Sequence, residues 1–181
     1  HVFNVAQCEN LANVPTLEVA HQFEPIKEGE RIVAAMPQRP EICHGSSRAC
    51  YSPREDKVSM PDPGLFRVPE SYYCVLFHEL THATGHQTRL NRDGITEAIH
   101  FGSDPYSKEE LVAEMGAAFL CGHCEMVNQT IEGSAGYIQS WLARLKDDKR
   151  LVVQAAAQAQ KACDFILAVH HTEEGVQHAA A

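Results

Sequence analysis

One short stretch of the chain has residue types and a spacing suited to metal chemistry. It is an H-E-x-x-H element, His78-Glu79-Leu80-Thr81-His82. Four residues make slightly more than one helical turn, so on a helix both imidazoles point the same way and can hold one metal ion. Glu79 is then left beside a metal-activated water as a general base. The alternative is a pair of surface histidines on an amphipathic helix.

A catalytic zinc site normally has three protein ligands and one open position, so a third ligand must be found. The metzincin pattern, H-E-x-x-H-x-x-G-x-x-H, places its glycine at Gly85 but its last histidine at Thr88, which excludes that class. His86 follows the glycine and stays open as a ligand. A histidine just past a helix C-terminus is also favoured by the helix dipole alone.

The better candidates lie in the downstream segment EELVAE, where Glu110 and Glu114 share one helix face. In glutamate zincins, a Glu on the next helix ligates the metal, and an acid one turn later can hold the first histidine by its outer nitrogen. We predict Glu110 as the third ligand and Glu114 as that acceptor. Two alternatives stay open: Glu114 is the ligand, or Ser107-x-x-Glu110 is a capping box.

Two further groups of residues invite a chemical role. Cys121-Gly-His-Cys124 resembles half of a zinc site, but four ligands are needed and no equally spaced partner pair exists. We therefore expect these thiols to pack in the core at a helix end. His100 and Tyr106, in a segment expected to be a loop, are candidate transition-state stabilisers.

Length, composition and charge limit the classes of protein to which the chain can belong. The chain has 181 residues, of which 44% are hydrophobic, and a formal net charge of −9, as expected of one ordinary globular domain. No apolar run reaches the roughly 18 residues of a membrane span, so no membrane partner is expected. Seven cysteines, an odd number, favour free thiols and a cytoplasmic location. The acidic charge disfavours tight nucleic-acid binding by this part alone.

The elements that must position the motif form an α+β pattern, mainly helical with a small antiparallel β-sheet. The HELTH helix should begin at Pro69 and end at Gly85 as a C′ glycine. A second helix capped by Ser107 should carry the glutamates, after an irregular, exposed loop over 86–106. The other expected elements are a helix at 28–36, an antiparallel meander within 41–61, and helices at 137–146 and 148–169.

Several stretches together resemble a known family. They are VFN-x-x-Q (Val2–Gln7), DKVSMP (Asp56–Pro61), YYCVLFHELTHATGH (Tyr72–His86), RLNRD (Arg89–Asp93) and FGSDPYSKEELVAEMGAAFLC (Phe101–Cys121). They resemble the C-terminal zincin-like metallopeptidase domain of ArdC-type antirestriction proteins, which also occurs in TraC-type plasmid primases. The resemblance implies a zincin-like fold. From the pattern along the chain we expect a connector and short helix over 1–40 and the metallopeptidase domain over 41–181, in one compact unit.

The resemblance also implies a metal held by His78, His82 and a Glu of EELVAE. It implies protection of plasmid DNA from restriction, and binding of single-stranded DNA through an N-terminal domain that this chain is expected to lack.

Two functions remain open at this stage. The first is a zinc-dependent metallopeptidase with one Zn²⁺ per chain on His78, His82 and Glu110, and Glu79 as the general base toward an unidentified protein or peptide substrate. The second is a metal-stabilised, non-catalytic module of a single-stranded-DNA-binding antirestriction protein. The presence of Glu79 favours the first, because a purely structural site needs no general base.

Overall fold

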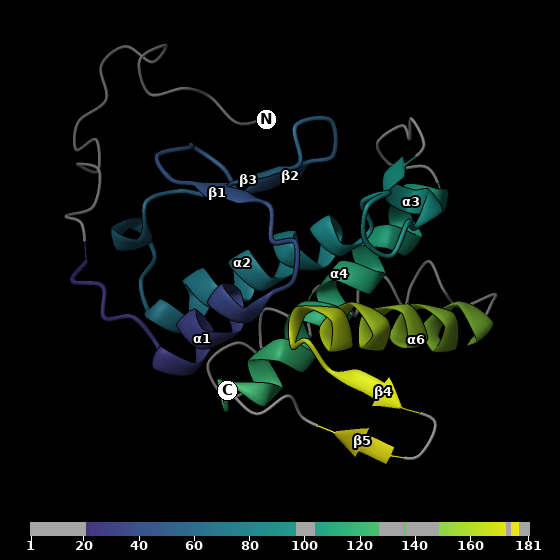
Figure 1. The fold of residues 1–181 in the computed structure, drawn as a ribbon. Helices are drawn as coiled ribbons and strands as arrows, with labels where there is room; N and C mark the ends of the chain where they lie inside the picture. The colour runs from purple at the N-terminus through teal and green to yellow at the C-terminus, as the bar shows by residue number, and fades with distance from the viewer. Residues whose placement is uncertain (1–20, 97–103, 127–135, 137–148, 173–174, 178–181) are drawn as a thin grey trace, which may run out of the picture.

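The computed structural model describes residues 21–96, 104–126, 136, 149–172 and 175–177 (Figure 1). Its helices are α1 (Lys27–Ala35), α2 (Pro69–Thr84), α3 (Asp93–Thr96), α4 (Asp104–His123) and α6 (Lys149–Ile166), with a short 3-10 turn, η2 (Pro63–Leu65). A three-stranded sheet of β1 (Glu41–Cys43), β2 (Cys50–Ser52) and β3 (Lys57–Ser59) lies above α2 in Figure 1, and α6 packs on α4. A hairpin of β4 (His170–Thr172) and β5 (Gly175–Gln177) follows α6. The predicted α+β, mainly helical class is confirmed.

The sheet is mixed, so the prediction of a wholly antiparallel meander is wrong in one pairing. β3 is the central strand; β2 pairs with it antiparallel, as a hairpin, but β1 pairs with it in parallel on the other side. Backbone hydrogen bonds from Met60 N to Cys43 O (2.8 Å) and from Ser46 N to Met60 O (3.1 Å) fix the ends of β1 and β3 together. Turn residues in the sequence indicated the hairpin, whereas the partner of β1 depends on a crossover that has no local signature.

Helix α2 begins and ends where the sequence predicts. Pro69 occupies the first turn, and Gly85 is the C-cap. Gly85 has φ −74°, so it does not adopt the left-handed conformation expected of a C′ glycine. A Cβ there would lie 2.5 Å from Ile95 Cγ1. Close packing of the following loop onto the helix end is therefore the reason for a glycine at this position.

Helix α4 begins at Asp104, earlier than the predicted cap at Ser107. Ser107 lies inside the helix, so the capping-box interpretation of Glu110 is wrong. Farther along, α4 crosses α2 at very short range: a Cβ on Gly116 would lie 2.6 Å from the side chain of Thr81, within the HELTH motif. This close approach brings the first half of α4 to the histidines of α2.

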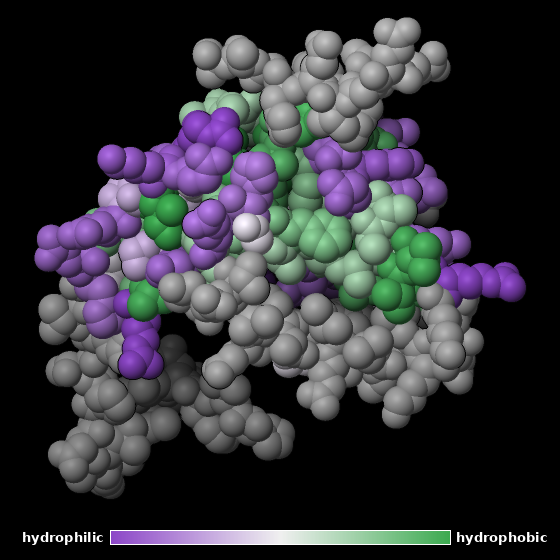
Figure 2. Space-filling view, turned by 90° about the horizontal axis from the view of Figure 1, so that it is seen from below, coloured by the Kyte–Doolittle hydropathy of each residue, from purple (hydrophilic) through white to green (hydrophobic). Residues whose placement is uncertain are grey.

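The main core lies among α1, β3, α2, α4 and α6, with a smaller apolar cluster between α4 and α6. The largest fully buried side chains of the main core include Tyr73, Phe77, Ile32 and Met60. Cys121 is buried in this core and Cys124 packs against it, as expected for the CGHC segment. On the face seen from below in Figure 1, hydrophobic residues gather at the centre and right, and hydrophilic residues lie on either side of them (Figure 2).

Two expected helices have different outcomes. The C-terminal one is present as α6, over 149–166, whereas the helix predicted at 137–146 lies outside the described residues. Within the ranges that the structure describes, no helix is both long and apolar enough to cross a membrane.

Candidate metal centre

His78, His82 and Glu110 converge on one point between α2 and α4. The two Nε2 atoms lie 3.0 Å apart. The Glu110 carboxylate oxygens lie 3.6 Å from His78 Nε2 and 3.5 Å from His82 Nε2. Around an ion with bonds of about 2.0–2.1 Å, tetrahedral ligands are separated by about 3.3 Å. The donor set and its spacing therefore fit a small divalent cation.

The outer nitrogen of each imidazole faces a carboxylate of α4. His78 Nδ1 lies 3.3 Å from Glu114 Oε1, and His82 Nδ1 lies 3.3 Å from Glu109 Oε1. Such contacts favour the proton on Nδ1 and leave the Nε2 lone pair for a metal. The orientation of both rings is thus fixed by the same helix that supplies the third ligand.

Glu109 is itself held by a buried guanidinium from the loop after α2. Arg92 donates to both Glu109 oxygens, from Nε at 3.0 Å and from Nη2 at 2.5 Å. It also donates to Thr84 Oγ1 (2.6 Å) and to the backbone oxygen of Thr81 (2.7 Å) at the end of α2. A chain of contacts therefore runs from this loop through Glu109 to the ring of His82.

The electrostatics of the cluster favour positive charge. Burial opposes protonation of His78, but hydrogen bonds with Glu110 and Glu114 outweigh it and raise the pKa of His78 to about 10. Burial alone would raise the pKa of Glu109, whereas the contacts with His82 and Arg92 lower it overall. The carboxylates that stabilise a proton on His78 are equally suited to a divalent cation, which competes with that proton for the ring nitrogen.

Glu79 is 8% exposed and follows the first histidine in α2. Its negative charge also raises the pKa of His78, so it belongs to the same electrostatic environment. It is not part of the three-residue ligand cluster. These features are compatible with the predicted proton-accepting role.

The remaining candidates are placed differently. His86 Nδ1 lies 2.8 Å from Thr88 Oγ1, and His86 is not part of the cluster that the described residues form. His100 lies outside the described residues. Tyr106 is in the first turns of α4, but its side chain is outside the described part of the chain.

Sequence reasoning missed Glu109 and Arg92. Glu109 precedes the predicted ligand directly, and a search for an acceptor for each histidine, instead of for the first alone, would have found it. Arg92 gave no signal, because Asn-Arg-Asp-Gly is typical of an exposed turn and this arginine is only 8% exposed.

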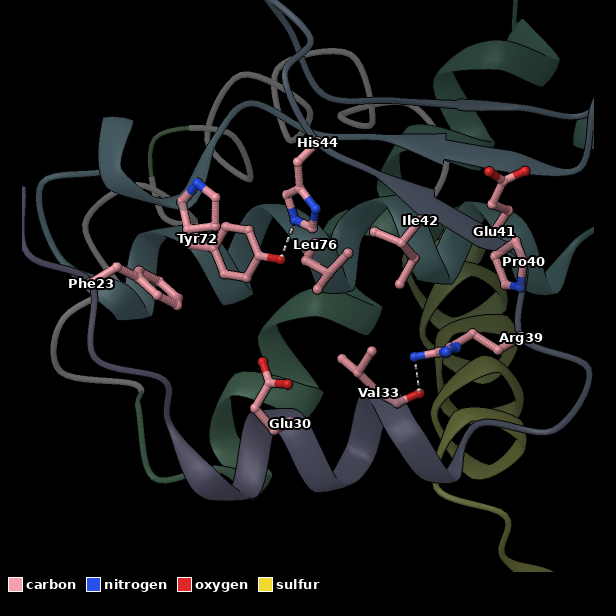
Figure 3. Close-up of a pocket in the computed structure, with 11 residues that line it drawn as sticks. Phe23, Glu30, Val33, Arg39, Pro40, Glu41, Ile42, His44, Tyr72 and Leu76 are labelled. Carbon is pink, nitrogen blue, oxygen red and sulfur yellow. Dashed lines mark hydrogen bonds between the residues drawn. The ribbon is translucent and has the colours of Figure 1, made fainter. Parts of the chain in front are cut away.

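A separate cavity of about 500 Å³ lies between α1, β1 and α2 (Figure 3). Its walls include Val33, Ile42 and Leu76, and Tyr72 OH contacts His44 Nε2 at 2.8 Å within it. Leu76 and His78 are two positions apart, about 200° around a helix, so they point to different sides of α2. No residue of the metal cluster lines this cavity.

An H-E-x-x-H helix with a glutamate from a second long helix, α4, places the protein among the zincin-like metallopeptidase-type domains. The comparison with known families agrees: residues 27–158 match the family described as zincin-like metallopeptidase, MPTase-PolyVal, and the chain belongs to it.

The chain is similar to parts of longer proteins. It is 37% identical over 165 residues to the uncharacterized protein y4eC of Sinorhizobium fredii, covering 91% of this chain and 52% of y4eC. It is 39% identical over 169 residues to DNA primase TraC of Escherichia coli, covering 92% of this chain and 15% of TraC.

A solved structure supports the same relationship. The crystal structure of the Mn(II)-bound antirestriction protein ArdC from plasmid R388 is 35% identical, with a TM-score of 0.60 over 81% of this chain and 54% of that one. The chain thus spans about half the length of ArdC and of y4eC, and the family resemblance predicted from the motifs is confirmed.

Proposed function

We propose that this domain is a metal-dependent peptidase whose cation is held by His78, His82 and Glu110. The observation that carries the proposal is the convergence of two imidazole nitrogens and a carboxylate within 4.8 Å, with Glu79 nearby and not among the ligands. Two imidazoles and one carboxylate are the ligand set of thermolysin-type catalytic zinc sites. We take Zn²⁺ as the first candidate, and Mn²⁺ as the second because ArdC was solved with Mn(II).

A bound divalent ion supplies Lewis-acid chemistry, lowering the pKa of water and polarising a carbonyl. Glu79 accepts the proton from the attacking water and passes it to the departing amide nitrogen. Glu114 and Glu109 hold His78 and His82 by their outer nitrogens, so that the ligands keep their geometry during this transfer.

We also propose that this domain acts within a larger antirestriction-type protein. The proposal is supported by the similarity to ArdC and to TraC, of which the chain matches only a part. Single-stranded DNA would be bound by a part of that protein outside this chain, because this chain has a net charge of −9.

The experiment that tests the peptidase proposal is a comparison of Glu79→Gln with the parent chain. Both are loaded with Zn²⁺ or Mn²⁺ and incubated with an unfolded protein and with a DNA-bound protein. Removing a general base typically costs about 10²–10⁴ in rate, so cleavage should fall by that order while metal content stays unchanged.

The matched control is Glu70→Gln, in the first turn of the same helix. It should cleave like the parent. Equal cleavage by Glu79→Gln and the parent would disprove the role of Glu79. Absence of cleavage by the metal-loaded parent would instead favour the second function, a metal-stabilised module without peptidase activity.

A further inference from the structure

We infer that Arg92 is a positioning residue of the metal centre, acting on His82 through Glu109. The inference rests on the proposed metal site and extends it to the loop that follows α2. Arg92 bonds to both oxygens of Glu109 and to the end of α2. It acts through the carboxylate that contacts the outer nitrogen of His82.

The geometry defines what Arg92 does. Its two bonds to Glu109 fix the plane of that carboxylate, because a guanidinium pairs with both oxygens in parallel. Its bonds to Thr81 O and Thr84 Oγ1 anchor the same guanidinium to the end of α2. Arg92 thereby fixes the α4 carboxylate relative to the helix that carries His82.

The need for a cation at this place follows from burial. The side chains of Arg92 and Glu109 are each 7% exposed. A buried carboxylate that loses its paired cation is unfavourable, so without Arg92 the side chain of Glu109 would have to rearrange. Its Oε1 would then leave the position 3.3 Å from His82 Nδ1, and the ring would lose the contact that fixes its orientation.

The two histidines therefore have different supports. Glu114 faces His78 at 3.3 Å, while Glu109 reaches His82 from a fixed pair with Arg92. The loop between α2 and α3 consequently has a role in metal affinity that its turn-like sequence did not indicate.

The test compares Arg92→Gln with Arg89→Gln in the full chain. Arg89 lies in the same loop and pairs with Asp56 through two hydrogen bonds of 2.8 Å. The other hydrogen bond of Asp56 comes from Tyr51 OH, beside the sheet. Both variants lose a buried arginine. They differ in whether the freed carboxylate touches a histidine of the cluster.

The measurements are the Zn²⁺ dissociation constant, from competition with a chromophoric chelator, and the visible absorption of the Co²⁺-substituted protein. Arg92→Gln should weaken Zn²⁺ binding by about 10–100-fold, the usual cost of losing a group that orients a ligand, and should change the Co²⁺ spectrum. Arg89→Gln should lower the melting temperature and leave both metal readouts unchanged.

Arg92→Lys keeps the charge but not the paired geometry, so it should recover part of the affinity. It also provides a variant if Arg92→Gln does not fold. Equal Zn²⁺ affinity in the parent, Arg92→Gln and Arg92→Lys would overturn the inference and leave the proposed metal site intact. No Zn²⁺ or Co²⁺ binding by the parent would overturn the proposed function itself.

Discussion

Two arginines of one loop, Arg89 and Arg92, each make paired hydrogen bonds to a carboxylate, but they support different regions of the molecule. Arg89, whose side chain is 1% exposed, pairs with Asp56 in the turn between β2 and β3 and donates to the backbone oxygens of Gln38 and Ala83. Arg92 pairs with Glu109 behind the metal cluster. The first joins the sheet, the α1–β1 connection and α2, and the second joins α2 to α4.

The difference shows that the role of each arginine depends on what else its carboxylate partner contacts. Asp56 accepts a further hydrogen bond from Tyr51 OH at 2.8 Å, so Arg89 stabilises the scaffold around the sheet. Glu109 instead contacts a candidate metal ligand. We call these two regions the scaffold side and the metal side, and each prediction below affects one of them.

The largest effect is expected from removing a ligand on the metal side. Glu110→Ala should lose stoichiometric Zn²⁺, because two imidazoles alone leave the cation one protein ligand short. Elemental analysis after gel filtration gives the metal content, with Glu55→Ala in the exposed β2–β3 turn as the control. Full metal content in Glu110→Ala would mean that another residue is the third ligand.

A smaller effect is expected one turn later on the same helix. Glu114→Ala removes the acceptor of His78 Nδ1, and we expect metal affinity to fall by about 10–100-fold without complete loss. Glu114→Gln keeps an acceptor oxygen and should bind more tightly than Glu114→Ala. Chelator competition measures both. A greater loss in Glu114→Ala than in Glu110→Ala would exchange their assigned roles.

The smallest effect concerns the scaffold side and pH. Burial alone would raise the pKa of Asp56, but hydrogen bonds from Arg89 and Tyr51 lower it below its ordinary value of 3.8. A carboxyl whose folded pKa is lowered stabilises the fold above its unfolded pKa, and this contribution is lost as the pH falls through the folded value.

The parent chain should therefore be more stable than Asp56→Asn near neutral pH, and the gap should shrink below about pH 4. The side chain of Asp56 is 34% exposed, and solvent screening limits the gap to about 1 kcal/mol or less. Urea unfolding with a chelator present, between about pH 6 and about pH 3, measures it. A gap that stays constant with pH would show that the carboxylate charge contributes nothing.

The sequence was most informative where local chemistry determines structure. Pro69 and Gly85 marked both ends of α2, and the spacing of His78 and His82 on that helix predicted their convergence. The same helical spacing placed Glu110 and Glu114 on one face of α4. There Glu110 lies near His78 Nε2 and Glu114 near His78 Nδ1.

The sequence was least informative where the structure depends on contacts between segments that lie far apart in the chain. Arg92 lies in an Asn-Arg-Asp-Gly cluster, and its burial follows from the packing of α4 against α2, which no short window contains. The parallel partner of β1 is set by a crossover in the same way. At Gly85 the residue was predicted correctly for the wrong reason, because contact with Ile95 and not a left-handed φ requires it.

The central claim is that His78, His82 and Glu110 form one metal centre. Its most direct test is a Zn²⁺ titration of the metal-stripped chain beside His78→Ala and His82→Ala, with bound metal counted per chain. We predict one equivalent in the parent chain and no stoichiometric metal in either variant. One equivalent retained in both histidine variants, or none bound by the parent chain, would contradict the account.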